Sequence, residues 1–220
     1  MKHPFAFLFL LSAIIILSFA SSLAAIEIPQ DYEDPIIEAS EDEGPREEPE
    51  RPAVPSFIMG MGNISPENMA AYLINVNPEA DRDFVGKLAV FYIEEAALEE
   101  VNHDVAFAQM CLETGYLGFG NLVTPEQYNF AGLGAKGPGF PGLSFPDPRT
   151  GVRAQIQHLK AYATDAPLNQ ELVNPRYFLV RLGSAPTISA LAGTWAEDIK
   201  YAEKISNVLE QMYFFSLETR

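Results

Sequence analysis

The residue of this chain whose setting most favours acid catalysis is Glu113. It follows the apolar stretch 105–112 (VAFAQMCL) and precedes glycines and aromatic residues (TGYLGFG). In the last turn of a buried helix, both desolvation and the negative end of the helix dipole raise a carboxyl pKa. A carboxylic acid that keeps its proton near neutral pH can protonate the leaving oxygen of a glycosidic bond. From the helix alone, a side chain that points into solvent is an equally good interpretation.

Other kinds of chemistry find little support in the sequence. His103 and His158 are isolated, and no HExxH motif or Cys/His cluster is present, so we expect neither a metal nor a cofactor. The string GLGAKG at 132–137 matches the letters of a dinucleotide fingerprint, but it follows no strand and opens no helix. The single cysteine, Cys111, lies in an apolar run and is expected to be a buried core residue rather than a catalytic thiol.

The part of the chain that must position Glu113 has the pattern of one helical domain. Apolar residues recur every three or four positions between residues typical of helix ends. The predicted helices span 65–73, 81–100, 104–114, 149–163, 186–195 and 198–214. Residues 131–147 are rich in Gly and Pro and should be irregular, with at most a small hairpin. No convincing strand pattern occurs, so we predict an all-α fold.

Two details of these helices are predicted from side-chain type. Asp104 should cap the helix that carries Glu113, because Asp accepts hydrogen bonds from the first backbone amides of a helix. Residues 94, 95, 99 and 100 are all glutamates and should form an acidic, solvent-facing side of the second helix.

The net charge of −16 is unevenly distributed. Residues 27–52 hold 11 acidic residues against Arg46 and Arg51. No basic face is evident, which disfavours nucleic acid and an anionic membrane surface as partners. We interpret residues 26–57 as an acidic, Pro-rich linker. An acidic tail that binds a basic partner is the alternative.

The first 25 residues have the pattern of a signal peptide. Lys2 precedes the apolar run 5–19, and small residues suited to cleavage follow near Ala24 or Ala25. An uncleaved membrane anchor is the alternative, since residues 5–25 are long enough to cross a bilayer. Either way we expect an exported protein, in the periplasm, the cell envelope or the medium. Residues 58–216 are then the single globular domain, expected to be a monomer.

Three sequence elements follow one another in order: AFAQ followed by ETG at 106–115, NFAGL at 129–133, and the set WA, D, YA and KI within 195–205. Together they resemble the glucosaminidase-domain family of peptidoglycan hydrolases. The resemblance covers most of 66–213. The ETG element alone is weak, because lytic transglycosylases share it, but the three elements together are fairly specific. The resemblance implies a lysozyme-like helical fold, a substrate cleft between two lobes, and cleavage of peptidoglycan on the N-acetylglucosamine side.

The same resemblance assigns catalytic roles. Glu113 matches the general acid, and Tyr201 matches a tyrosine that lies near the acid and the substrate's acetamido group. A core aromatic is the alternative for Tyr201. Many family members carry a second acid about 30 residues after the first. Here Asp147 is the only acid in the corresponding Gly/Pro-rich segment, and Glu126 is better explained by its place in the first turn of a helix.

Further residues are candidates for contact with the sugar. Asn129 and Phe130 match the loop that shapes the floor of the sugar site, and Gly132 and Tyr116 are additional candidates. Trp195 could stack on a sugar ring, although packing in the core is the stronger expectation, and packing is an equal alternative for Phe130. Two other functions stay open: a lytic transglycosylase or muramidase on the same fold, and a non-catalytic glycan-binding protein.

Overall fold

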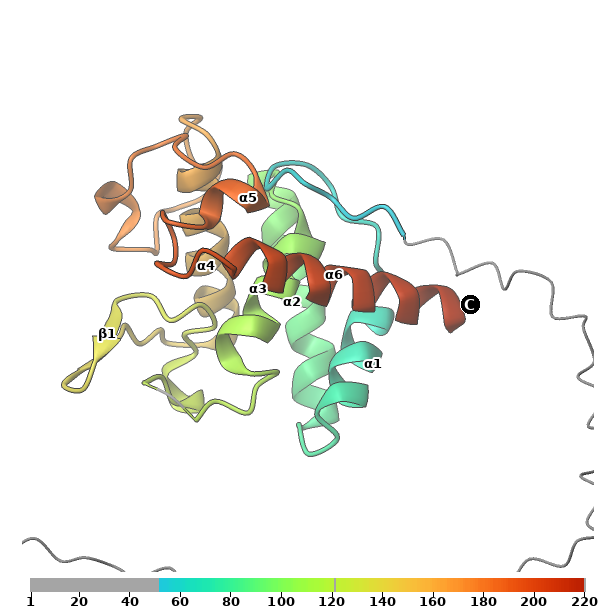
Figure 1. The fold of residues 1–220 in the computed structure, drawn as a ribbon. Helices are drawn as coiled ribbons and strands as arrows, with labels where there is room; N and C mark the ends of the chain where they lie inside the picture. Colours follow the sequence, from blue (N-terminus) through green and yellow to red (C-terminus); the bar gives the residue numbers. More distant parts are fainter. Residues whose placement is uncertain (1–51, 121, 220) are drawn as a thin grey trace, which may run out of the picture. The chain divides into compact units, whose positions relative to one another are not determined.

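The computed structural model describes residues 52–120 and 122–219, so the predicted signal peptide and most of the predicted linker lie outside the described residues. The chain forms helices α1 (Pro66–Val76), α2 (Arg82–Glu99), α3 (His103–Thr114), α4 (Pro148–Ala163), α5 (Ile188–Leu191) and α6 (Tyr201–Glu218) (Figure 1). Two 3-10 turns, η1 (Pro125–Gln127) and η2 (Tyr177–Leu179), and a hairpin of β1 (Ala135–Gly137) and β2 (Phe140–Pro141) complete it. The mainly helical architecture confirms the predicted all-α, lysozyme-like class.

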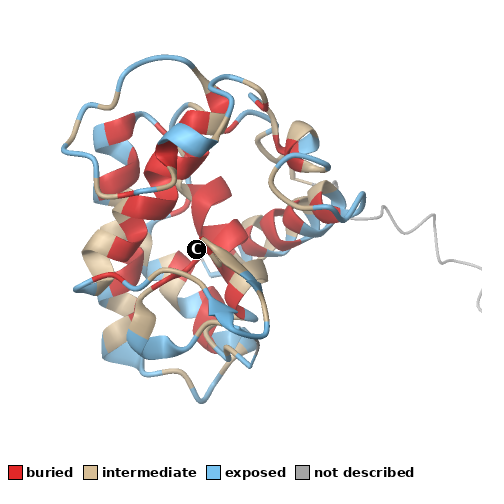
Figure 2. Ribbon diagram, turned by 90° about the vertical axis from the view of Figure 1, so that its left-hand side faces the viewer, coloured by how far each residue is buried: buried red, intermediate tan, exposed pale blue. Residues whose placement is uncertain are grey.

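Helix α3 runs through the centre of the described residues. Every residue from Asp104 to Cys111 is buried, and α3 contacts α2, α4 and α6. Figure 2 shows buried residues gathered on the inward sides of the helices. Tyr92 of α2 packs edge-on against Phe107 of α3, with ring centroids 5.4 Å apart. The central position predicted for this helix is confirmed, and so is the burial of Cys111.

Two predicted helix ends are confirmed. The Ser65 hydroxyl accepts a hydrogen bond from the amide of Asn68 at the start of α1, with Pro66 in the first turn. Gly115 ends α3 in the left-handed region at φ 57°. Helix α1 continues to Val76, three residues beyond the prediction. By contrast, α5 is a single turn at Ile188–Leu191, shorter than predicted, and α6 begins at Tyr201.

The prediction that Asp104 caps α3 is wrong. Asn102 takes that position, and its Oδ1 accepts from the amides of Asp104 and Val105 at 3.0 and 3.3 Å. The Asp104 carboxylate is fully buried and accepts from the amide of Asn63 and the hydroxyl of Tyr213, both at 2.7 Å. Asp104 therefore joins the segment before α1 to α3 and α6.

The predicted solvent-facing acidic side of α2 is wrong for Glu95 and Glu99. Both are fully buried, whereas Glu94 and Glu100 are exposed. Helix α4 covers that side of α2 and supplies cations to pair with the two buried carboxylates. The pairs are Arg153 Nε with Glu95 at 2.8 Å, Arg149 Nη1 with Glu95 at 3.0 Å, and Lys160 Nζ with Glu99 at 2.8 Å.

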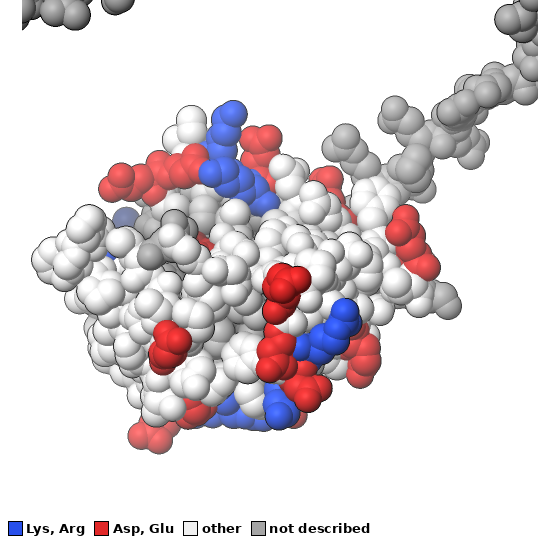
Figure 3. Space-filling view, turned by 90° about the horizontal axis from the view of Figure 1, so that it is seen from below, with Lys and Arg blue, Asp and Glu red and all other residues white. Residues whose placement is uncertain are grey.

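On the outer surface, Lys and Arg side chains are few and lie beside acidic ones on the face that Figure 3 shows. Lys204 and Asp198, near the start of α6, form an exposed ion pair 2.7 Å apart. Along the described part of the chain, no helix is both long and apolar enough to span a membrane.

We expect the buried Glu95 carboxylate of α2, paired with Arg153 and Arg149 of α4, to make the free energy of unfolding depend on pH. Burial raises the pKa of the Glu95 carboxyl, but the hydrogen bonds and charge of Arg153 and Arg149 outweigh burial and bring the pKa below its ordinary value of 4.5. The paired carboxylate therefore stabilises the fold above pH 4.5, and that contribution disappears as pH falls further.

The measurement is urea denaturation of the wild type and Glu95→Gln between about pH 7 and pH 3. The variant should lose about 3–5 kcal/mol at neutral pH. The gap between the two proteins should narrow towards the acid end, and a gap that stays constant would contradict this account.

Candidate active site

Three side chains from two distant parts of the chain meet at the end of α3. Glu113 lies in the last turn of α3, Trp195 lies in the segment between α5 and α6, and Tyr201 is the first residue of α6. The Tyr201 hydroxyl donates to Oε1 of Glu113 at 2.5 Å, and the indole Nε1 of Trp195 donates to the same oxygen at 3.1 Å. The structure thus brings together three residues that the sequence singled out separately.

The second carboxylate oxygen, Oε2, faces Gly132. A Cβ atom on Gly132 would lie 3.7 Å from it, and Gly132 has φ +62°, which favours glycine. Oε2 has no hydrogen-bond partner among the described residues. Because Oε1 already accepts two hydrogen bonds, the proton of the neutral acid belongs on Oε2.

Glu113 lines a cavity of about 200 Å³ between the end of α3 and the loop that leads to the hairpin. The lining comprises Glu113, Thr114, Phe119, Leu122, Val123, Asn129, Gly132 and Ala135. A second cavity, of about 270 Å³, shares Gly132 and Ala135 with the first and is bounded by Trp195. The two cavities adjoin at these shared residues, and we refer to them together as the cleft.

The setting of Glu113 shifts its acidity. Burial raises the pKa of its carboxyl, and the hydrogen bonds from Tyr201 and Trp195 oppose that shift without cancelling it, so the pKa lies above 4.5. Burial also holds the pKa of Tyr201 well above its ordinary value, so its hydroxyl stays protonated and remains a donor. The carboxyl keeps its proton to a higher pH than an exposed glutamate, as a general acid requires.

Comparisons with known proteins bear on this geometry. The family model described as mannosyl-glycoprotein endo-beta-N-acetylglucosaminidase, or glucosaminidase, matches residues 89–214, which include α3, the cleft and the start of α6. The chain belongs to the glucosaminidase family. An uncharacterized protein of Borreliella burgdorferi is 42% identical over 156 residues, which cover 71% of this chain and 76% of that protein. No solved structure matches the chain. The family is one of peptidoglycan glycosidases, so a glycoside hydrolase activity is supported.

Within this glucosaminidase fold, the Tyr201 hydroxyl is oriented by a buried row of polar side chains. Tyr92 donates to Gln155 Oε1 at 2.5 Å, Gln155 Nε2 donates to Gln109 Oε1 at 2.8 Å, and Gln109 Nε2 donates to the Tyr201 oxygen at 3.0 Å. All these donors point along one direction, towards Glu113. Since its oxygen already accepts from Gln109, the Tyr201 hydroxyl directs its own proton to the carboxylate.

A backbone carbonyl fixes the direction of this row. Gln155 Nε2 also donates to the carbonyl oxygen of Ala106 at 3.0 Å, and a carbonyl can only accept. The amide of Gln155 therefore cannot be turned over, and the orientation of Gln109 follows from it. Gln155 and Tyr92 are not predicted from the sequence, whereas Gln109 falls inside the AFAQ element.

Of the other residues predicted to contact the sugar, Asn129 lines the cleft, whereas Phe130 and Tyr116 do not. Asn129 lines the first cavity, and its amide also braces the loop, donating to the carbonyls of Leu133 and Leu143 at 3.0 Å. Phe130 is only 1% exposed and packs in the core, so packing accounts for it. The Tyr116 hydroxyl lies 3.2 Å from that of Tyr72 of α1, and Tyr116 lines neither cavity of the cleft.

The predicted second acid does not face Glu113 across the cleft. Asp147 caps α4, where its carboxylate accepts from the amide of Thr150 at 2.9 Å, and this bond lowers the pKa of Asp147. Glu126 is exposed in η1, and the neighbouring Thr124 lowers the pKa of its carboxyl. Among the described residues that line the two cavities, Glu113 is the only carboxylate.

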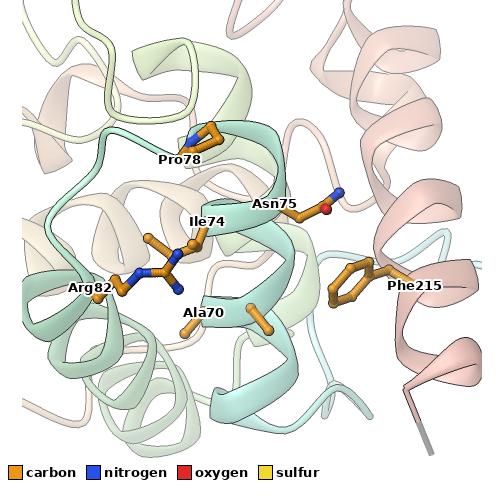
Figure 4. A pocket seen from close by; sticks show the side chains of 7 residues that line it. Ala70, Ile74, Asn75, Pro78, Arg82 and Phe215 are labelled. Atoms are coloured by element: carbon orange, nitrogen blue, oxygen red, sulfur yellow. The ribbon is translucent and has the colours of Figure 1, made fainter.

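Elsewhere, a hollow of about 550 Å³ lies between α1, the start of α2 and the end of α6 (Figure 4). Its single charged lining residue is Arg82, so it offers no acid for catalysis. No group of three or more His, Cys, Asp or Glu residues that could hold a metal ion occurs in the described ranges.

We expect Tyr201→Phe to shift the pH profile of glycoside hydrolysis by this member of the glucosaminidase family. The substitution removes one of the hydrogen bonds that hold the pKa of Glu113 down, so the pKa should rise further and the alkaline limb of kcat/KM should move to higher pH. The maximal rate should fall by about tenfold or more, since the carboxylate left after proton transfer loses a donor.

Tyr213→Phe is the matched control, because Tyr213 also lies on α6 and donates to a carboxylate, that of Asp104. It should reduce stability and leave the pH profile in place. An unchanged profile for Tyr201→Phe would show that its hydroxyl does not tune the acid.

Proposed function

We propose that the protein is exported and hydrolyses the β-1,4 bond on the N-acetylglucosamine side of peptidoglycan glycan strands, with Glu113 as general acid. The observation that carries the proposal is the Glu113 carboxyl, with a raised pKa and with Oε2 facing Gly132 in the first cavity. Export is supported by the signal-like pattern of residues 1–25 and by the location of peptidoglycan outside the cytoplasm.

In the proposed first step, the proton on Oε2 passes to the glycosidic oxygen while the bond between that oxygen and C1 breaks. Glu113 then carries a negative charge in a partly buried site. The donors Tyr201 and Trp195 already contact Oε1, and hydrogen bonds to an ionised carboxylate are stronger than those to a neutral one. They stabilise the carboxylate as it forms and need no rearrangement to do so.

The positive charge that develops at C1 needs a partner, and no second carboxylate lines the cleft in the described residues. Catalysis by a water held by Tyr201 is disfavoured, because the Tyr201 hydroxyl already donates to Glu113 and accepts from Gln109. Tyr201 is also only 5% exposed, which leaves little access for a water. We infer that the acetamido oxygen of the substrate attacks C1 instead. The Glu113 carboxylate can then take a proton from the water that opens this intermediate.

A lytic transglycosylase is the second candidate, and the single carboxylate of the cleft is the observation that favours it. Such an enzyme needs only one acid, because a hydroxyl of the muramyl residue attacks C1 in place of water. The products separate the two reactions.

The test is digestion of purified peptidoglycan by the wild type, Glu113→Gln and Asp147→Asn, with the products reduced and analysed by mass spectrometry. The wild type should release strands that end in reducing N-acetylglucosamine. Glu113→Gln should be slower by about 10²–10⁴-fold, the usual contribution of a general acid. Asp147→Asn should keep full activity, because Asn also caps helices well.

Other products would change the proposal. Anhydro-muramic ends would identify a transglycosylase, and reducing muramic ends a muramidase. Equal release by Glu113→Gln and the wild type would exclude Glu113 as the acid. If neither protein released fragments from several types of wall, a non-catalytic glycan-binding role would replace hydrolysis.

A further inference from the structure

The second cavity of the cleft has a distinct chemical character. Lys136 of β1, Arg176 just before η2 and His158 of α4 all line it, together with Tyr162 and Trp195. Its lining contains no acidic residue, although the chain has 30 acidic residues and only 14 Lys and Arg. Among the described residues, neither Lys136 nor Arg176 forms an ion pair within 4.0 Å. The cavity therefore holds positive charge that the described protein groups do not neutralise.

Arg176 is held in place by its neighbours. Its backbone amide donates to Oδ1 of Asn174 at 3.0 Å, and Asn174 is fully buried. The side chain of Arg176 passes the backbone of Gly134, where a Cβ atom would lie 3.6 Å from Cδ of the arginine. Gly134 has φ +79°, a backbone conformation that favours glycine, and the Arg176 side chain lies close against this turn.

Asn174 also fixes the proton of His158. Because Oδ1 of Asn174 accepts from Arg176, its Nδ2 must be the group that donates to Nδ1 of His158, at 2.8 Å. Burial, with a smaller contribution from the charge of Arg176, lowers the pKa of His158 to about 4, so the ring is neutral. Its single proton lies on Nε2, which has no acceptor among the described residues.

This cavity lies next to the acid. Trp195 lines it and donates to Glu113, while Gly132 belongs to both cavities and faces Oε2. A glycan strand bound with one bond at Glu113 would place the neighbouring sugar beyond Gly132 and Trp195. In peptidoglycan, N-acetylglucosamine is uncharged, and the sugar next to it is always a muramyl residue. That residue carries either a free lactyl carboxylate or a stem peptide with carboxylates of its own.

We propose that Arg176 and Lys136, together with Nε2–H of His158, bind a carboxylate of the muramyl residue next to the bond at Glu113. This inference rests on the proposed function. A guanidinium, an ammonium and a neutral N–H donor around one cavity match the acceptors of a carboxylate, and the cavity holds no acid to repel it. The site would let the protein distinguish peptidoglycan from an uncharged polymer of N-acetylglucosamine.

The test measures binding without turnover, in the full chain carrying Glu113→Gln. Trp195 is the only tryptophan, so its fluorescence reports directly from the cleft. The ligands are peptidoglycan oligomers with stem peptides, the same oligomers stripped to the lactyl carboxylate, and an uncharged N-acetylglucosamine oligomer of equal length. Arg176→Gln should weaken binding of a carboxylate-bearing oligomer by about tenfold and leave the uncharged oligomer unaffected.

Matched variants guard against a general effect. Arg176→Lys should bind carboxylate-bearing oligomers more tightly than Arg176→Gln does. Lys136→Gln, on the exposed hairpin, should also weaken this binding, and it serves as the test variant if Arg176→Gln folds poorly. Arg82→Gln, in the separate hollow of Figure 4, should change nothing. A loss confined to stripped oligomers identifies the lactyl group as the ligand, and a loss confined to the peptide-bearing ones identifies the stem peptide.

The outcome can be separated from that of the proposed function. Binding that depends on Arg176 in a protein that cleaves nothing would keep this inference and remove the hydrolase. Cleavage of peptidoglycan with equal effects of Arg176→Gln on all three ligands, or no binding of any of them, would overturn the carboxylate site.

Discussion

The arrangement of the cleft depends on the burial of one carboxylate at the end of an apolar helix. Burying Glu113 without partners would be costly, so the chain must bring donors to it. Trp195 and Tyr201 supply them from a segment more than 80 residues further along. Both contact Oε1, which leaves Oε2 facing Gly132 and the first cavity. The need of this carboxylate for hydrogen-bond donors therefore fixes how the start of α6 is placed against the end of α3.

That requirement extends into the core. Gln109 donates to the Tyr201 oxygen and so directs the Tyr201 proton towards Glu113, and Gln155 and Tyr92 continue the row behind Gln109. The row crosses α3, α4 and α2 in turn, so these helices are tied to the site by hydrogen bonds as well as by apolar packing. A buried polar row of this kind is favourable because its members satisfy one another.

The sequence predicts the helices well where apolar spacing defines them. The apolar helix and the resemblance point to Glu113, and the resemblance points to Tyr201, whereas core packing is the stronger expectation for Trp195. It fails where a side chain's role depends on a partner far along the chain. Glu95 and Glu99 resemble a solvated acidic face, and only the packing of α4 reveals their pairing with Arg153 and Lys160. The role of Gln155 is missed for the same reason, since the sequence does not distinguish a buried amide side chain from an exposed one. The error at Asp104 has a local cause: the helix is capped by Asn102, two residues earlier, so Asp104 lies in the first turn and its carboxylate binds Asn63 and Tyr213 instead.

Both donors to the acid lie on one short stretch of backbone, residues 195–201. Backbone hydrogen bonds fold this region back on itself, from the Gly193 amide to the carbonyl of Ala196 at 2.7 Å and from the Tyr201 amide to the carbonyl of Asp198 at 3.0 Å. Because both donors come from this one stretch, its displacement from α3 would remove both hydrogen bonds to Glu113 in the same event. Catalytic competence would then be governed by the docking of this stretch and not by the melting of the helices. Activity would then be lost on heating at a lower temperature than the helical signal in far-ultraviolet circular dichroism.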